Sequence, residues 1–255
     1  LFPFFVLSSL VVELGMSRYL GRLFQPVMAP LFRVNGACAS ALALGFVGGY
    51  PVGARTAISL YQNGQCSKTE AERLLAFCNN SGPAFIFGVV GAGVFGSGAL
   101  GLLLYLVHMA ASLLVGLLFR FYRPGEGPRR GRLQGAQFQT ASFPAAFTHS
   151  VTGALNICAF VLFFTVTIRM LSLTGVLTGL ARLLSLLFGP LGFDQSWARR
   201  LLTGVLEVSS GVSSLTGGSL SGRLSMAAFM LGWAGLSVHC QVRLSMRMVT
   251  VKNST

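Results

Sequence analysis

The stretch that decides the fold is "GFVGGYPVGARTAISL", residues 45–60, where an apolar segment stops before it has crossed a membrane. The run Gly48-Gly49-Tyr50-Pro51 predicts a helix end, because glycine and proline are the residues least compatible with a helix interior. Arg55 follows shortly afterwards. A helix that ends at membrane depth leaves backbone N–H and C=O groups without partners, so other groups are needed to satisfy them.

The composition around this stretch is that of a membrane protein. Of 255 residues, 53% are hydrophobic and 10% are charged, whereas soluble domains carry about 25% charged residues. Residues 74–119 contain no Asp, Glu, Lys or Arg, which leaves room for two crossings of roughly 20 residues each. Further crossings are expected over 144–168 and 224–242, and an interrupted one over 34–54. The opening "LFPFFVLSSL" shows no secretory signal and predicts a chain that starts inside a helix.

The formal net charge of +13 indicates orientation in the membrane rather than nucleic-acid binding. Arginines gather between residues 120 and 132, with only Glu126 opposing them. Basic residues concentrate where helices leave the membrane on the cytoplasmic side. We therefore expect residues 123–143 to form a cytoplasmic linker, and we expect no nucleic-acid partner.

No motif in the chain indicates an enzyme, a cofactor or a metal site. The five cysteines are scattered and form no CxxC pair. The sequence "GAGVFG", residues 91–96, matches GxGxxG, but it lies in an uncharged run with no acidic residue about 20 positions later. No HExxH, GxSxG or Walker motif occurs. We expect no catalytic residues.

A comparison of the chain with itself indicates a duplication. At a shift of 160 positions, Gly15 meets Gly175, Arg22 meets Arg182 and Pro30 meets Pro190. Continuing this shift lays the break at 48–51 over Val208-Ser209-Ser210-Gly211, and a shift of 153 lays 81–84 over 234–237. The predicted fold class is therefore all-α and polytopic, with two inverted repeats and discontinuous helices. The predicted domains are a first repeat at 1–122, the linker at 123–143 and a second repeat at 144–255.

Paired interruptions in two halves are the sequence pattern of a transporter's binding site. Half-helix N-termini stabilise anions there, although a single break can also serve helix packing alone. Arg55 can hold an acidic solute in a bidentate contact or extend to the interface. Glu207, an acid in an apolar segment, can bind a cation, carry a proton or neutralise an arginine. His239 can titrate near neutrality or have a structural role.

The residues also resemble a known family. The block "GGYPVGARTA…LYQNGQCSKTEAERLLAFCNNSGPAFIFGVVG", together with "GVLEVSSGVSSL" and "GWAGLSVHCQV", resembles the YlbJ family of sporulation integral membrane proteins. That family is part of the Gate, or nucleoside-recognition, group, which has a duplicated inverted-repeat architecture. The resemblance implies movement of dipicolinic acid during sporulation, in the outer forespore membrane of a bacterial cell. Val208-Ser209-Ser210 departs from the family pattern and puts an asparagine contact there in doubt.

The predicted function is transport of a small anionic solute, with dipicolinic acid implied by the resemblance. The alternatives are transport of a nucleoside-like solute and a membrane scaffold in spore envelope assembly that transports nothing. Besides the solute, the expected partners are the lipid bilayer and, as an open alternative, further copies of the chain. The predicted solute-binding residues lie at the four interruptions: Gly49, Tyr50, Pro51, Gly53, Arg55, Asn79, Asn80, Ser81, Gly82, Pro83, Glu207, Ser209, Ser210, Gly211, His239 and Gln241.

Overall fold

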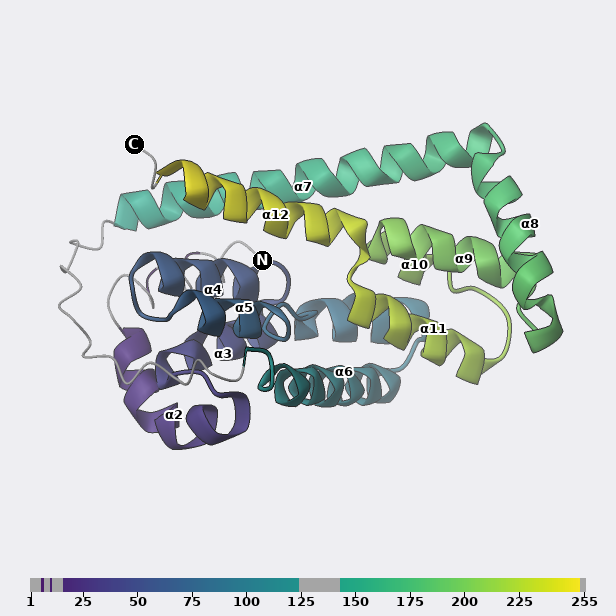
Figure 1. Ribbon diagram of the computed structural model, residues 1–255. Coiled ribbons are helices and arrows are strands. Elements are labelled where there is room, and N and C mark those ends of the chain that lie inside the picture. The colour runs from purple at the N-terminus through teal and green to yellow at the C-terminus, as the bar shows by residue number, and fades with distance from the viewer. Residues whose placement is uncertain (1–5, 7–9, 11–15, 124–142, 253–255) are drawn as a thin grey trace. The chain divides into compact units, whose positions relative to one another are not determined.

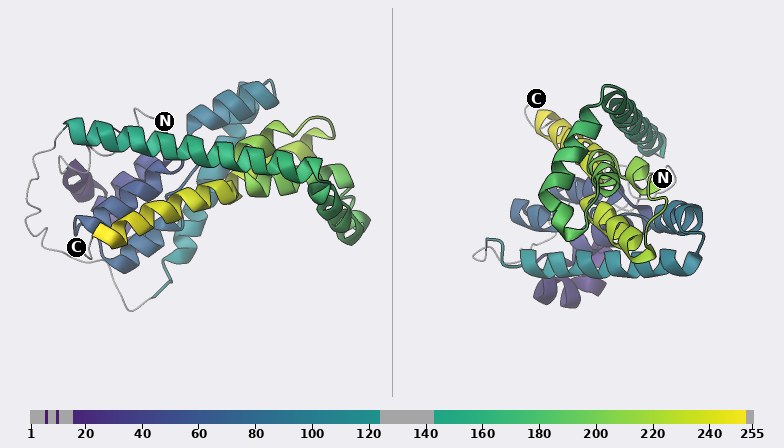
Figure 2. Two further views of the ribbon diagram at one scale, coloured as in Figure 1. Left: turned by 90° about the horizontal axis from the view of Figure 1, so that it is seen from above. Right: turned by 90° about the vertical axis from the view of Figure 1, so that its right-hand side faces the viewer.

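The computed structural model describes residues 16–123 and 143–252 together with Val6 and Leu10, and within these residues it contains helices but no strand (Figure 1). The all-α prediction is confirmed for this part of the chain. Two helical segments are long and apolar enough to cross a membrane: α6 (Gly98–Phe119) and residues Ser150–Leu173 of α7 (Phe143–Leu173). Figures 1 and 2 show α7 as one unbroken helix. The predicted helix at 1–14 and the predicted linker fall almost wholly outside the described residues.

The described chain forms two compact units, each assembled from separate parts of the sequence. The first unit takes residues 1–83, 108–155 and 242–255, and the second takes residues 84–107 and 156–241. The first contains α2 (Met16–Phe32), η1 (Gly36–Cys38), α3 (Ala39–Gly48), α4 (Val52–Gln62) and α5 (Lys68–Leu75). The second contains η2 (Ala84–Val94), α8 (Val176–Phe188), η3 (Gly189–Leu191), α9 (Gln195–Leu206), α10 (Val208–Ser213), α11 (Leu220–Trp233) and the start of α12 (Gly235–Lys252).

The core of the first unit is apolar and is fixed by a short charged helix. The rings of Phe32 and Phe77 stack with their centroids 4.9 Å apart. At the start of α5, the Ser67 hydroxyl accepts from the Glu70 N–H, and the Glu70 carboxylate accepts from the Ser67 N–H, so the two residues form a capping box. The other Glu70 oxygen accepts from the Asn35 N–H at 2.8 Å, which anchors the turn before η1.

Arg73 of α5 is the largest side chain that is wholly buried. Its guanidinium donates to the carbonyl oxygens of Arg33 at 2.7 Å, of Tyr122 at 2.8 and 3.1 Å and of Arg123 at 2.9 Å. These carbonyls follow the ends of α2 and α6, where a helix leaves C=O groups unpaired and a positive charge is favourable. Arg73 therefore holds two helix ends in place.

Arg223 of α11 has a similar position in the second unit. Its guanidinium donates to the carbonyl oxygens of Leu215 and Val94, both at 2.8 Å, and lies 4.9 Å from the centre of the Phe95 ring. It thereby fixes the end of η2 and the loop after α10. In both units an arginine thus donates to carbonyl oxygens at the ends of helices and in loops.

Three differences from the predicted elements stand out. Only α6 of the uncharged run 74–119 is long enough to span, because η2 is a short π-helix that ends at Val94. The run 224–242 was expected to cross the membrane, but it is divided at Ala234, which has a φ of +69° and lies at the predicted fourth interruption, and neither part is among the helices long and apolar enough to span. The short helix α4 directly follows the predicted break 48–51, whereas α10 contains the predicted break 208–211, and the sequence pattern revealed neither helix.

The two halves of the sequence have the same order of elements. A helix rich in exposed apolar residues, a 3₁₀ turn, a helix, an interruption and a short helix occur as α2-η1-α3-α4 and again as α8-η3-α9-α10. Helix ends fall at the predicted interruptions 48–51, 81–84 and 234–237, whereas the predicted interruption 208–211 is helical and the break lies one residue earlier, at Glu207. An inverted relation between the halves, and a position of these helix ends at membrane depth, stay predictions, as do the domain boundaries.

Candidate functional site

The first two interruptions meet within the first unit. α3 ends at Gly48 and α4 begins at Val52, while the chain between α5 and η2 passes through Gly82. A methyl carbon on Gly49 would lie 2.7 Å from the Gly82 nitrogen, and one on Gly82 would lie 3.1 Å from the Gly49 Cα. Gly49 also has a φ of +77°, which L-residues with a side chain rarely adopt. Glycine at both positions therefore lets the two backbones touch.

Two further glycines bring the flanking helices against the second interruption. A methyl group on Gly45 of α3, or on Gly53 of α4, would collide with the carbonyl oxygen of Cys78. Both residues are buried. Gly53 was predicted as a site residue, and its position explains the need for glycine through packing, whereas Gly45 was not predicted.

Polar groups collect where the two interruptions meet. The Ser81 N–H donates to His108 Nε2 of α6 at 3.0 Å, and the Asn80 amide donates to the Phe77 carbonyl at 2.9 Å. Asn79 Oδ1 is buried and has no hydrogen-bond partner in the described part of the chain. Buried polar atoms are normally paired, so this oxygen is a candidate for binding water or a ligand. The buried Ser81 hydroxyl lies within reach of the Tyr50 side chain.

His108 and Ser112 line this region from α6, and sequence reasoning did not select them. Both are buried, and the Ser112 hydroxyl donates to the Phe77 carbonyl at 2.6 Å. Since His108 accepts a hydrogen bond at Nε2 from a backbone N–H, it is the neutral tautomer with its proton on Nδ1. A signal existed in the sequence: these are polar residues in the otherwise apolar stretch 98–119.

Arg55 lies on α4 and is half-buried against α7. A methyl group on Gly153 would collide with the Arg55 Nη1 atom, so the guanidinium occupies the space that this glycine leaves open. The charge is thus held inside the first unit and is not extended toward solvent. Pro51, whose peptide bond to Tyr50 is cis, stands at the N-terminus of α4 and provides no side-chain cap there.

In the second unit, Glu207 occupies the third interruption. The residue is extended, with a φ of −147°, and it separates α9 from α10. Its carboxylate accepts from the N–H groups of Ser209 at 2.9 Å and Ser210 at 2.7 Å, and only 1% of the residue is exposed. The predicted residues Ser209 and Ser210 therefore contribute backbone donors, and the protein's own carboxylate already satisfies them.

The fourth interruption packs on the third in the way that the second packs on the first. Gly235 has a φ of +81°, and a methyl carbon there would lie 2.9 Å from the Val208 nitrogen. The predicted residue Gly211 packs so closely on Gly204 that a methyl group would collide with its Cα. Each unit therefore contains two helix interruptions held together by glycine contacts.

The last two predicted residues point in different directions. His239 is exposed, and its Nε2 lies 3.0 Å from the carbonyl oxygen of Trp233, with the two rings edge to face at 5.0 Å. Gln241 is buried and donates to the Ser237 hydroxyl at 3.2 Å. The structure does not bring these two side chains together.

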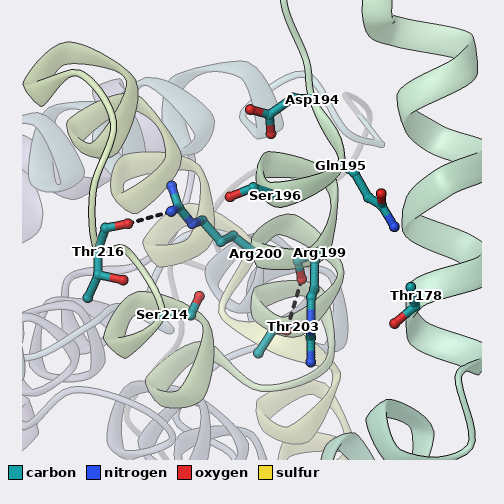
Figure 3. Close-up of a pocket in the computed structure, with 9 residues that line it drawn as sticks. All are labelled: Thr178, Asp194, Gln195, Ser196, Arg199, Arg200, Thr203, Ser214 and Thr216. Atoms are coloured by element: carbon teal, nitrogen blue, oxygen red, sulfur yellow. Dashed lines mark hydrogen bonds between the residues drawn. The ribbon is translucent and has the colours of Figure 1, made fainter.

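A polar hollow of about 640 Å³ lies elsewhere in the second unit, between α8, α9 and the loop after α10 (Figure 3). It contains none of the predicted site residues. Its lining comes from polar residues that the sequence analysis did not select: Thr178, Asp194, Gln195, Ser196, Arg199, Arg200, Thr203, Ser214 and Thr216. In the described ranges, no three His, Cys, Asp or Glu side chains are grouped so that they could hold a metal ion.

Comparison with known proteins relates the chain to one family. Residues 1–123 match the Gate family, described as nucleoside recognition. The chain is 35% identical over 268 aligned positions to the sporulation integral membrane protein YlbJ of Bacillus subtilis strain 168, across 95% of this chain and 65% of that protein. The chain thus spans less than two thirds of this relative's length. No solved structure matches it. The resemblance stated above is confirmed, and with its apolar helices the chain is an integral membrane protein.

Proposed function

We propose that this Gate-type membrane protein, a relative of the sporulation protein YlbJ, carries a small anionic solute across the membrane and that the solute is dipicolinate. The observation that carries the proposal is the meeting of two helix interruptions in the first unit, beside a buried polar atom that lacks a partner among the described residues. Discontinuous helices are the structures that transporters use to build solute sites. The unpaired Asn79 Oδ1 at this point favours a site that binds a polar solute over a tightly packed scaffold.

The charges around this meeting point suit an anion. The N-terminus of α4 has no side-chain cap, and the peptide dipoles of its 11 residues favour negative charge there. Arg55 lies on the same helix, one turn after Pro51. A dicarboxylate can therefore receive donors from the start of α4 and from Arg55, while the Ser81 hydroxyl donates to the other carboxylate.

Glu207 has a different part in this proposal. Its carboxylate binds the start of α10 in the way that a bound carboxylate would, through two backbone donors. We assign it the role of a gate or proton-coupling group, because its release on protonation would free these donors.

Reconstituted vesicles loaded with terbium test the proposal, because dipicolinate that enters chelates the ion and sensitises its luminescence. We expect uptake by the wild-type chain and a loss of at least about tenfold in Arg55→Ala, since charge-assisted hydrogen bonds contribute roughly 1.5–3 kcal/mol. The matched control is Arg169→Ala, which removes an exposed arginine from α7. Uptake that is equal in wild type, Arg55→Ala and empty vesicles contradicts the proposal.

A nucleoside-like solute is the second candidate, and the description of the Gate family favours it. It would use the Tyr50 ring for stacking and the amides of Asn79 and Asn80 for hydrogen bonds, and it would need Arg55 less. A competition panel of nucleosides against pyridine dicarboxylates distinguishes the two. A scaffold that transports nothing predicts no change in thermal unfolding with either solute.

A further inference from the structure

The polar hollow of the second unit has the size of a small-molecule site but is not part of the proposed transport site. Its volume of about 640 Å³ lies within the usual range for ligand pockets. In Figure 3 the side chains of Thr178 and Gln195 extend into the space between α8 and α9, and Arg199 lies beside Thr203 below them. All the lining residues come from one unit, so the hollow is defined without reference to the other.

Of the two arginines that line this hollow, Arg199 has no partner among the residues that the structure describes. Arg200 donates to the carbonyl oxygens of Thr216 and Gly217 and lies 4.7 Å from the centre of the Trp197 ring. The Asp194 carboxylate accepts from the Trp197 N–H at 2.8 Å and caps α9. Arg199 is exposed, and its guanidinium has no hydrogen bond or ion pair with any residue that the structure describes.

Hydroxyl groups line the same hollow as the Arg199 guanidinium. The Thr203 hydroxyl donates to the Arg199 carbonyl at 2.9 Å, and the Ser214 hydroxyl donates to the Gly211 carbonyl at 2.6 Å, so both are engaged. The hydroxyls of Thr178 and Ser196 make no hydrogen bond within the described chain. An unpaired guanidinium with two unpaired hydroxyls is the donor set that a phosphate group requires.

The helix that forms one wall of the hollow presents apolar side chains on its outer side. Leu177 and Ala181 of α8 are buried, whereas Leu180, Leu183 and Leu187 are exposed by 46%, 54% and 65%. A helix that is apolar on its outer side and lies beside polar donors is suited to the membrane interface, with leucines toward acyl chains and donors at headgroup depth. Trp197 next to the hollow is a residue type enriched at that depth.

We propose that this hollow binds the phosphate headgroup of an anionic phospholipid. Arg199 provides the charge, Thr178 and Ser196 donate hydrogen bonds to phosphate oxygens, and the acyl chains lie along the exposed leucines of α8. The wall of leucines favours a lipid over a soluble phosphate, because a free phosphate would gain nothing from an adjacent apolar surface. The proposal assigns no part in solute transport to this site, and it stands independently of the transported solute.

Trp197 provides a direct test, because its ring lies beside the hollow. In a Trp233→Phe background Trp197 is the sole tryptophan of the chain. Its fluorescence is measured in vesicles of zwitterionic lipid to which phosphatidylglycerol or phosphatidylcholine with brominated chains is added. We expect the brominated phosphatidylglycerol to quench at concentrations about fivefold lower than phosphatidylcholine, and we expect Arg199→Gln to remove this preference, since one arginine near the surface contributes about that factor.

Two further variants and one soluble probe keep the test decisive. Arg182→Gln removes an exposed arginine of α8 outside the hollow and is expected to retain the preference. Thr178→Val removes a hydroxyl without a charge change and is expected to weaken the preference in part. This variant still tests the site if Arg199→Gln does not fold. If inorganic phosphate alone shifts the Trp197 emission and brominated lipid does not quench, or if all variants quench alike, the lipid assignment is wrong.

Discussion

At the scale of single residues, several glycines of this chain lie so close to a neighbouring group that no side chain would fit. Gly45 and Gly53 face the Cys78 carbonyl, Gly49 faces Gly82, and Gly153 faces Arg55. None of these contacts can be inferred from spacing along the sequence, because the partners lie far apart in the chain. The sequence marked Gly49 and Gly82 as helix-breaking residues, whereas the structure adds that they touch.

Gly153→Ala tests the position of Arg55. Alanine has the higher helix propensity by about 1 kcal/mol, so the change alone favours α7. The added methyl group would nevertheless displace the guanidinium. We expect dipicolinate uptake to fall toward the level of Arg55→Ala while thermal unfolding stays within a few degrees of wild type. If Gly153→Ala takes up dipicolinate at the wild-type level, the position of the Arg55 guanidinium is not needed for transport.

Arg73→Met tests the role of Arg73 at the ends of α2 and α6. The substitution leaves the carbonyl oxygens of Arg33 and Tyr122 without their donors inside the fold. Buried groups left unpaired cost roughly 1–3 kcal/mol each, and each kcal/mol lowers Tm by about 2–4 °C in a chain of this size. We expect a Tm lower by roughly 6 °C or more in detergent. Arg169→Met, on the surface of α7, is the matched control. Equal Tm values for both variants would refute the role.

At the scale of elements, the sequence predicted the all-α fold and the apolar runs that contain α6 and α7, because hydrophobic runs are local signals. It did not reveal α4, which follows the break at 48–51, or α10, which contains the predicted break 208–211, since glycine, proline and serine residues predict a loop. Their helical conformation depends on packing: α4 against Cys78 through Gly53, and α10 against Gly204 through Gly211. The same dependence on distant contacts hid Gly153 from the candidate site, whereas His108 had a local signal as a polar residue in an apolar stretch.

Glu207→Ala tests the start of α10. The substitution removes both bonds from the carboxylate to Ser209 and Ser210, whereas Glu207→Gln keeps one oxygen acceptor. Loss of an N-cap costs roughly 0.5–2 kcal/mol. We therefore expect Tm to fall in the order wild type, Glu207→Gln, Glu207→Ala. Ser219→Ala, which removes the N-cap of α11, gives a reference value for a simple cap. If Glu207→Ala has an unchanged Tm, its carboxylate does not stabilise the interruption.

At the scale of the whole molecule, the basic residues after α6 predict which side of the membrane its C-terminal end faces. Arg120 and Arg123 follow its last turn, and Arg123 lies 3.5 Å from Glu72. Basic residues at a helix end favour the cytoplasmic side. The similarity to a sporulation integral membrane protein and the apolar helices support a membrane location, whereas the forespore membrane stays a prediction.

Cysteine labelling tests this orientation. In a background in which Cys158 and Cys240 are replaced by serine, Phe121→Cys marks the basic end of α6 and Gly98→Cys marks its other end, where an added side chain meets no atom within 4 Å. We expect an impermeant maleimide to label Gly98→Cys in intact cells and to label Phe121→Cys only after the membrane is opened. Labelling of Phe121→Cys in intact cells would reverse the assignment.

The central claim is that the meeting of two helix interruptions in the first unit holds the anion. The most direct measurement is a crystal of the chain soaked with 4-bromopyridine-2,6-dicarboxylate, in which anomalous scattering locates the bromine. The account predicts a bromine peak beside Gly49 and Gly82, with one carboxylate at Arg55. A peak confined to the hollow between α8 and α9, or no peak in the first unit at saturating ligand, would contradict it.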